Sequence, residues 1–336
     1  MPRVRGASST GFIRPGTLAQ KASRLGTALC VAAVLAAGAA RAGEPPAWAY
    51  PVPLEKHTPP ADDGKPVQVA GSTVTYTPAQ LHDFYAAVDW HPEEHPPMPP
   101  VVAKGRPPEV YACGFCHRAD GSGGPENARL AGLPYGYILQ QLADLRSGAR
   151  RTALPQRMPQ AAMTAVARAL TPEDARAAAA YFSTLKPRRN IRVVEAATVP
   201  RTMMPGWFFA AAPGGGTEPI GARIVEMPED LTAFERRDTH AQFIAYVPPG
   251  SLARGAAIVA GAKTPACATC HGEGLRGKGN VPGLAGRSPS YVVRQLYDIQ
   301  SGARAGQAVQ VMRGLVARLD ANDMVDLAAY IASMAP

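Results

Sequence analysis

The first 42 residues of this 336-residue chain contain no acidic residue. They hold six of the 35 Lys and Arg residues, so the net charge of +9 falls to +3 (29 basic against 26 acidic) when this stretch is set aside. Clustered positive charge is what attracts nucleic acids and other polyanions. The nearly balanced remainder argues against that function, and we expect no nucleic-acid partner.

A hydrophobic run long enough to cross a bilayer is also missing. The longest one, Ala28–Ala40, has 13 residues, whereas a membrane helix needs about 20. A basic segment precedes this run and Ala40-Arg41-Ala42 follows it, which is the layout of a secretory signal peptide. We therefore predict a signal peptide over residues 1–42, and a mature periplasmic chain without a transmembrane span.

Cysteine is scarce, with five in the whole chain, and Cys30 lies in the predicted signal peptide. The other four occur in two copies of one motif, Cys113-Gly-Phe-Cys116-His117 and Cys267-Ala-Thr-Cys270-His271. Four cysteines in an exported protein would ordinarily form two disulfides. Here a histidine directly follows each pair, and Cys-x-x-Cys-His is the attachment signature of c-type haem.

The spacing suits this chemistry because two intervening residues place both thiols on one side of a helical turn. The adjacent His117 or His271 can then reach the iron as an axial ligand. A thioredoxin-like redox pair gives these histidines no role, and a zinc site built from both cysteine pairs leaves them surplus. The sequence therefore predicts two covalently bound haem c groups, attached through Cys113, Cys116, Cys267 and Cys270.

The two motifs belong to a longer internal repeat. When the sequence is compared with itself at an offset of 154 residues, several short segments of the two copies match. The predicted final helices match at an offset of 149 residues. The matched pairs are Leu130-Ala-Gly132 with Leu284-Ala-Gly286, Tyr137 with Tyr291, Gln141-Leu142 with Gln295-Leu296, Ser147–Arg150 with Ser301–Arg304, and Ala179-Ala-Tyr181 with Ala328-Ala-Tyr330. Helical periodicity recurs in both copies, which predicts short helices and loops around each haem. Arg150 and Arg304 could contact haem propionates or a partner, or be solvated loop charges.

The repeat also singles out two of the ten methionines. Met163 lies seven residues before Leu170, and Met312 lies seven before Leu319, so the two coincide. Met158 has no counterpart. A thioether on a loop opposite a proximal histidine closes the iron of an electron-transfer haem. We predict that Met163 and Met312 are the sixth ligands, on loops before the final helices.

These motifs resemble those of class I cytochromes c, in particular the two-haem cytochrome c4 group. The resemblance implies axial pairs His117–Met163 and His271–Met312. It also implies that the Pro282 carbonyl orients His271, and Ala128 occupies the matching place in the first copy. The implied fold is mainly α, with two haem domains at about residues 105–186 and 251–336.

Two segments depart from that group. An extension (43–104) is rich in proline and has one expected helix from Thr77 to about Val88, while an insert (187–250) alternates like strands and is expected to be β-rich. The extension also contains residue types that can bind haem iron, but we expect none of them to do so. These residues are His82, His91, His95 and Met98. The insert has one histidine, His240, and is expected to act only mechanically, as a spacer or docking face.

The preferred function is that of a periplasmic electron carrier with two haems and redox protein partners. No Ser-His-Asp set, carboxylate pair or phosphate-binding loop accompanies the haem motifs, so no catalytic residue is assigned. Two alternatives remain. The chain could be the subunit through which electrons enter a dehydrogenase or oxidase complex at the membrane, or a two-haem enzyme such as a peroxidase, which needs an open iron position.

Overall fold

The computed structural model describes residues 44–53 and 63–336. The predicted signal peptide and Cys30 lie outside the described residues. Among the helices that are described, none is long and apolar enough to span a membrane.

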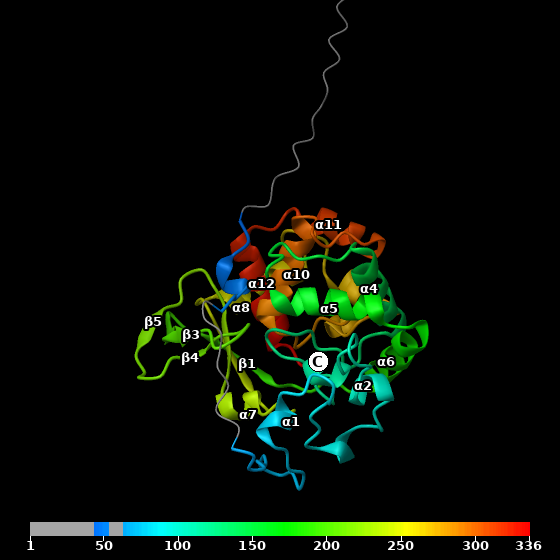
Figure 1. Cartoon of the computed structure of the whole chain (residues 1–336). Coiled ribbons are helices and arrows are strands. Elements are labelled where there is room, and N and C mark those ends of the chain that lie inside the picture. Colours follow the sequence, from blue (N-terminus) through cyan, green and yellow to red (C-terminus); the bar gives the residue numbers. More distant parts are fainter. Residues whose placement is uncertain (1–43, 54–62) are drawn as a thin grey trace, which may run out of the picture. The chain divides into compact units, whose positions relative to one another are not determined.

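The first copy of the repeat contains four helices. They are α3 (Cys113–His117), α4 (Tyr135–Ser147), α5 (Met158–Ala169) and α6 (Pro172–Thr184), and α4 packs against both α5 and α6 (Figure 1). Helix α6 begins where the Thr171 hydroxyl accepts a hydrogen bond from the Asp174 amide and Pro172 takes the first helical position. Its buried face carries Ala178, Tyr181 and Phe182, as its periodicity predicts.

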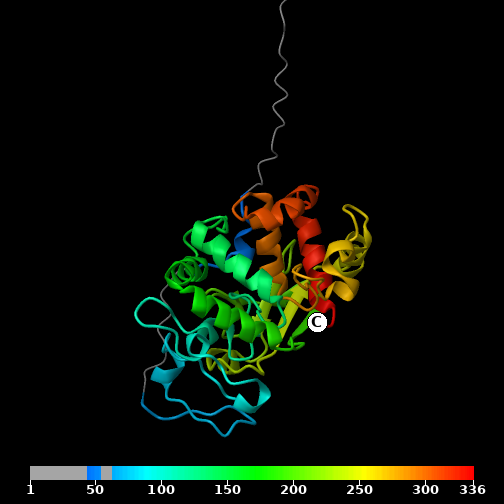
Figure 2. The same cartoon turned by 90° about the vertical axis from the view of Figure 1, so that its right-hand side faces the viewer.

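The second copy repeats this arrangement. Its elements are α8 (Ser251–Ala260), α9 (Ala268–His271), η3 (Glu273–Leu275), α10 (Pro289–Gln300), η4 (Gln307–Val309), α11 (Gln310–Val316) and α12 (Ala321–Ser333). Helix α12 lies beside α10 (Figure 2) and packs along α8. The repeated glycines Gly132 and Gly286 both have positive φ, and their amides bond to the carbonyls of Phe182 and Ile331 in the final helices. Glycine adopts this conformation without steric cost.

The insert contains every named strand of the described residues. They are β1 (Ile191–Glu195), β2 (Thr198–Pro200), β3 (Thr202–Met203), β4 (Ala210–Ala211), β5 (Thr217–Pro219), β6 (Val225–Pro228) and β7 (Phe243–Val247), with α7 (Leu231–Glu235) between the last two. Strand β7 is central, parallel to β1 and antiparallel to β6. Val193 and Val247 of this sheet pack into the core of the second copy. The segment is therefore fastened to a haem domain.

The extension contributes η1 (Ala47–Ala49), α1 (Pro78–Leu81), η2 (Pro92–Glu94) and α2 (Pro100–Ala103). Helix α1 has the expected Thr77 cap but ends at Leu81, so the expected helix to Val88 is wrong. The physical reason is a side-chain turn, in which the Asp83 carboxylate accepts from the Tyr85 amide at 2.8 Å and competes with helical bonding.

Both parts of the extension are packed onto the repeat. The Tyr50 hydroxyl donates to Asp298 Oδ1 of α10 at 2.8 Å. Val101 and Val102 of α2 are buried in the core of the first copy. The extension therefore binds both copies through short helices rather than trailing from them.

Candidate functional site

Both motif histidines are held by a carbonyl in the same way. Nδ1 of His117 lies 2.8 Å from the Ala128 oxygen, and Nδ1 of His271 lies 2.8 Å from the Pro282 oxygen. Nδ1 must carry the proton in such a bond, so Nε2 keeps its lone pair and can bind iron. Burial also lowers the pKa of both imidazoles, which favours the neutral, ligating form. The expected carbonyl contact is thus present in both copies, including the one with alanine.

A cavity of about 290 Å³ lies against the first motif. Cys113, Cys116 and His117 line one side of it, and Met158 and Met163 of α5 are also in its wall. Most of the remaining lining residues are apolar, and α4, α5 and α6 each contribute some of them. A largely apolar pocket beside two thiols and an imidazole is what covalent haem needs.

The polar atoms of this cavity point to the same group. Arg157 Nε, Gln141 Nε2 and Gln160 Nε2 are buried in its wall and have no hydrogen-bond partner. Unsatisfied buried donors are costly and rare in native proteins. Haem carries two propionate carboxylates, which are acceptors of the kind these donors lack. The residues present therefore fit a haem.

The thiols do not have the properties of a redox pair. All four described cysteines are free. Burial raises the pKa of the Cys113 thiol to about 12, and it also raises the pKa of Cys116 and Cys267. Thioredoxin-like chemistry requires a lowered thiol pKa. The geometry therefore favours thiols that form thioether links over thiols that exchange disulfides.

Met163 and Met312 lie on helices, so the expectation that they lie on loops is wrong. Met163 is within α5 and Met312 is within α11. Helix α5 continues beyond Met163 to Ala169, and α11 continues beyond Met312 to Val316; a short non-helical link then precedes each final helix. Both side chains pack, half-buried, against the core of their own copy. Met158 also reaches the first cavity but is 43% exposed.

Arg150 and Arg304 are not solvated loop charges. They meet each other across the boundary between the two copies. Arg150 donates to the Tyr291 hydroxyl and the Gln295 amide oxygen, both at 3.1 Å. Arg304 makes the matching bonds to the Tyr137 hydroxyl at 3.0 Å and the Gln141 oxygen at 2.8 Å. The matched segments of the repeat thus form one nearly two-fold polar contact, which fixes the spacing of the two haem motifs.

The cavity wall also contains residues from outside the first copy, which sequence reasoning did not identify. Phe84 comes from the extension, Trp207 and Arg237 from the insert, and Tyr291, Arg294, Gln295 and Asp298 from the second copy. Arg237 stacks on the Phe115 ring at 3.6 Å and donates to the Phe115 carbonyl at 2.9 Å, within the first motif itself. The insert therefore contributes side chains to the wall of the first cavity, a contact that its expected role as spacer or docking face did not include.

Arg118, the residue after the first motif, makes a second contact between this motif and the insert. It has φ 68° and ψ 158°, a conformation that is essentially restricted to glycine, and the matching residue of the second copy is Gly272. Its guanidinium lies 5.0 Å from the Phe234 ring and donates to the Phe234 carbonyl at 3.1 Å. This anchoring holds Arg118 where a glycine would otherwise be expected.

The cysteine pairs of the two motifs differ in exposure. Cys270 is exposed, whereas Cys267 and Met312 pack, half-buried, against the core of the second copy. His271 is 7% exposed. The two sites thus share the same motif residues but differ in how much of each cysteine pair is exposed.

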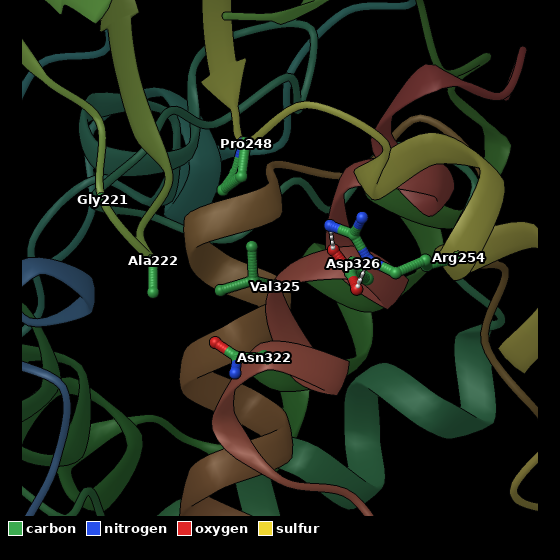
Figure 3. A pocket seen from close by; sticks show the side chains of 7 residues that line it. All are labelled: Gly221, Ala222, Pro248, Arg254, Asn322, Val325 and Asp326. Carbon is green, nitrogen blue, oxygen red and sulfur yellow. Dashed lines mark hydrogen bonds and ion pairs between the residues drawn. The ribbon is translucent and has the colours of Figure 1, made fainter. Parts of the chain in front are cut away.

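Another hollow, between the insert and α12, lacks this chemistry. Gly221, Ala222, Pro248, Arg254, Asn322, Val325 and Asp326 line it (Figure 3). Its two charged residues neutralise each other, since Arg254 Nε and Nη2 donate to the Asp326 carboxylate at 2.7 and 3.0 Å (Figure 3). With no thiol or imidazole in its wall, it is not a candidate for haem.

One prediction concerns the buried cation of the first cavity. Arg157 is 4% exposed, and burial lowers its pKa to about 9, so it is charged at neutral pH. Arg157→Gln should lower the potential of the first haem on the order of 40 mV, because it removes a buried positive charge that favours reduced iron. A spectroscopic redox titration measures this.

Arg168 is exposed in the last turn of α5, whereas Arg157 is the buried residue just before that helix; Arg168→Gln is the matched control and should shift neither potential. Equal shifts in the two variants would mean that Arg157 does not face the haem.

Comparison with known proteins agrees with this geometry. The family described as cytochrome c matches residues 103–186 and 252–335, together half of the chain. Similar curated proteins include the thiosulfate dehydrogenase electron acceptor of Thiomonas intermedia, with 29% identity over 66% of this chain and 77% of the relative. Cytochrome c4 of Azotobacter vinelandii is 28% identical over 66% of this chain and 84% of its own. The thiosulfate dehydrogenase electron acceptor of Stutzerimonas stutzeri is 30% identical over 68% and 82%.

Solved structures with a related sequence include thiosulfate dehydrogenase (TsdBA) from Marichromatium purpuratum, with 29% identity and a TM-score of 0.48. The match covers 70% of this chain but only 39% of that one. Reduced recombinant cytochrome c4 from Pseudomonas stutzeri is 24% identical, with a TM-score of 0.44, over 66% of this chain and 93% of its own.

Proposed function

Because the chain belongs to the cytochrome c family and has two cytochrome c domains in tandem, like cytochrome c4, we propose that it is an exported two-haem electron carrier. Haem c, when bound, supplies a one-electron iron couple. The covalent links come from Cys113, Cys116, Cys267 and Cys270. The axial ligands are His117 with Met163, and His271 with Met312.

The observation that carries the proposal is the set of buried groups around the first cavity. The Ala128 carbonyl orients His117, and Met163 lies in the wall of the same cavity. Three buried nitrogen donors in this wall have no hydrogen-bond partner, and haem propionates would supply acceptors for them. The apolar residues of α4, α5 and α6 would keep water away from the haem. An apolar environment disfavours the more highly charged ferric iron and so favours the reduced state. Fixed ligands and a dry site favour electron transfer over substrate binding.

The experiment that tests this proposal is a redox titration of the purified mature protein, followed by its absorption spectrum. We expect two one-electron transitions, and low-spin spectra with a methionine-ligated band in the oxidised form. Hydrogen peroxide should not be turned over. One high-spin haem together with peroxide turnover would instead assign the chain to the peroxidase class.

The partners that we propose are redox proteins, with a dehydrogenase as donor. Two relatives are named thiosulfate dehydrogenase electron acceptor, which supports a donor of that class. Periplasmic location rests on the predicted signal peptide. A permanent subunit of a membrane complex would co-purify with its partner, whereas a free carrier would be recovered alone.

A further inference from the structure

Two histidines that are 149 positions apart in the sequence meet where the extension touches the insert. His91, at the start of η2, stacks on His240, which precedes β7, with ring centroids 3.8 Å apart and planes within 5°. Asp238 completes the group, with Oδ1 3.4 Å from His91 Nε2. One donor atom from each of the three residues lies within 4.8 Å of the others. The extension also brings His91 close to Glu93 and Glu94, but those two carboxylates are exposed, and only the set with Asp238 and His240 joins the extension to the insert.

The inner nitrogen of His91 is available to a ligand. His91 is 3% exposed, and its Nε2 has no hydrogen-bond partner. A buried polar atom without a partner is costly, and a neutral imidazole nitrogen is a preferred ligand of Zn²⁺ and similar ions. The unpaired atom faces the carboxylate of Asp238, itself only 10% exposed.

Hydrogen bonds from surrounding residues hold these three side chains in place, as the residues around the ligands of a metal site do. Both carboxylate oxygens of Glu94 lie 3.0 Å from His240 Nε2, and Arg188 donates to the same carboxylate. With the Nε2 proton donated outward, Nδ1 of His240 keeps its lone pair. Glu93 lies 3.8 Å from Nδ1 of His91. The Asp238 carboxylate is oriented by the His240 backbone amide at 2.9 Å.

We propose that His91, Asp238 and His240 bind a divalent transition-metal ion of the Zn²⁺ class. Two imidazoles, one carboxylate and a water molecule are a common ligand set for zinc. Tetrahedral bonds of about 2.0–2.1 Å place the ligand atoms about 3.3 Å apart, so the stacked rings must tilt as the ion enters. The His240 side chain is 35% exposed and has room to turn. The ion would link the extension to the insert, next to Arg237 of the first haem site.

The test is Zn²⁺ binding to the purified holoprotein after treatment with a chelator, measured by calorimetry and by metal analysis. We expect one Zn²⁺ per chain beyond the haem iron. His91→Gln should weaken binding at least 100-fold, and Zn²⁺ should raise the unfolding temperature of the wild type but not of this variant. His82→Gln, an exposed histidine of the extension whose ring contacts the Pro78 carbonyl of its own turn, should bind normally.

Two results would overturn the proposal: no tight Zn²⁺ binding by folded wild type, or equal binding by wild type and His91→Gln. If His91→Gln does not fold, the more exposed His240→Gln serves as the second variant and should also lose binding. Haem content is measured on the same samples. Failure of the zinc site is thus distinguishable from failure of the haem assignment.

Discussion

Met163→Ala is expected to lower the potential of one haem on the order of 0.1–0.2 V, a fraction of the roughly 0.8 V that axial ligation spans. The thioether of methionine stabilises reduced iron, and its loss leaves a coordination position open. The variant should therefore bind carbon monoxide or cyanide at one haem and lose part of the methionine-ligated band. Met312→Ala should do the same at the other haem only.

Met158→Ala is the matched control, because Met158 lies on the same helix and in the same cavity wall as Met163. It is 43% exposed and has no counterpart in the second copy. We expect both potentials to stay nearly unchanged. If Met158→Ala opens the first haem while Met163→Ala does not, the repeat has been aligned wrongly in α5.

The second large effect is on haem attachment. Mass spectrometry of the mature protein should show two haem groups added to a chain that begins at Gly43. Cys113→Ala should impair covalent attachment in the first domain only, and Cys267→Ala in the second only, because each motif lies against the core of its own copy.

Cys30→Ala is the control for general cysteine effects, since Cys30 is predicted to leave with the signal peptide. Its mature mass should equal that of the wild type. A mature protein with one haem or none would rule out the two-site interpretation.

The chemistry of the sites could be predicted from the sequence because it depends on local spacing. Each cysteine pair has two residues between its cysteines and a histidine directly after it, and the pattern repeats at an offset of 154 residues. These features predicted two sites of haem attachment. The carbonyl contacts of His117 and His271 lie only 11 residues along the chain from each histidine. Helix caps at Thr171 and Asp320 are local in the same sense, and both form.

What the sequence alone determined, then, is the two Cys-x-x-Cys-His motifs and the residues next to them, since short-range geometry follows from neighbouring residues. Only the tertiary structure decided which distant residues enclose them. The meeting of Arg150 with Arg304, the place of Arg237 on the first motif and the pairing of His91 with His240 all join segments at least 120 positions apart. No periodicity records such contacts, because they arise when separately formed elements bury their apolar faces against one another.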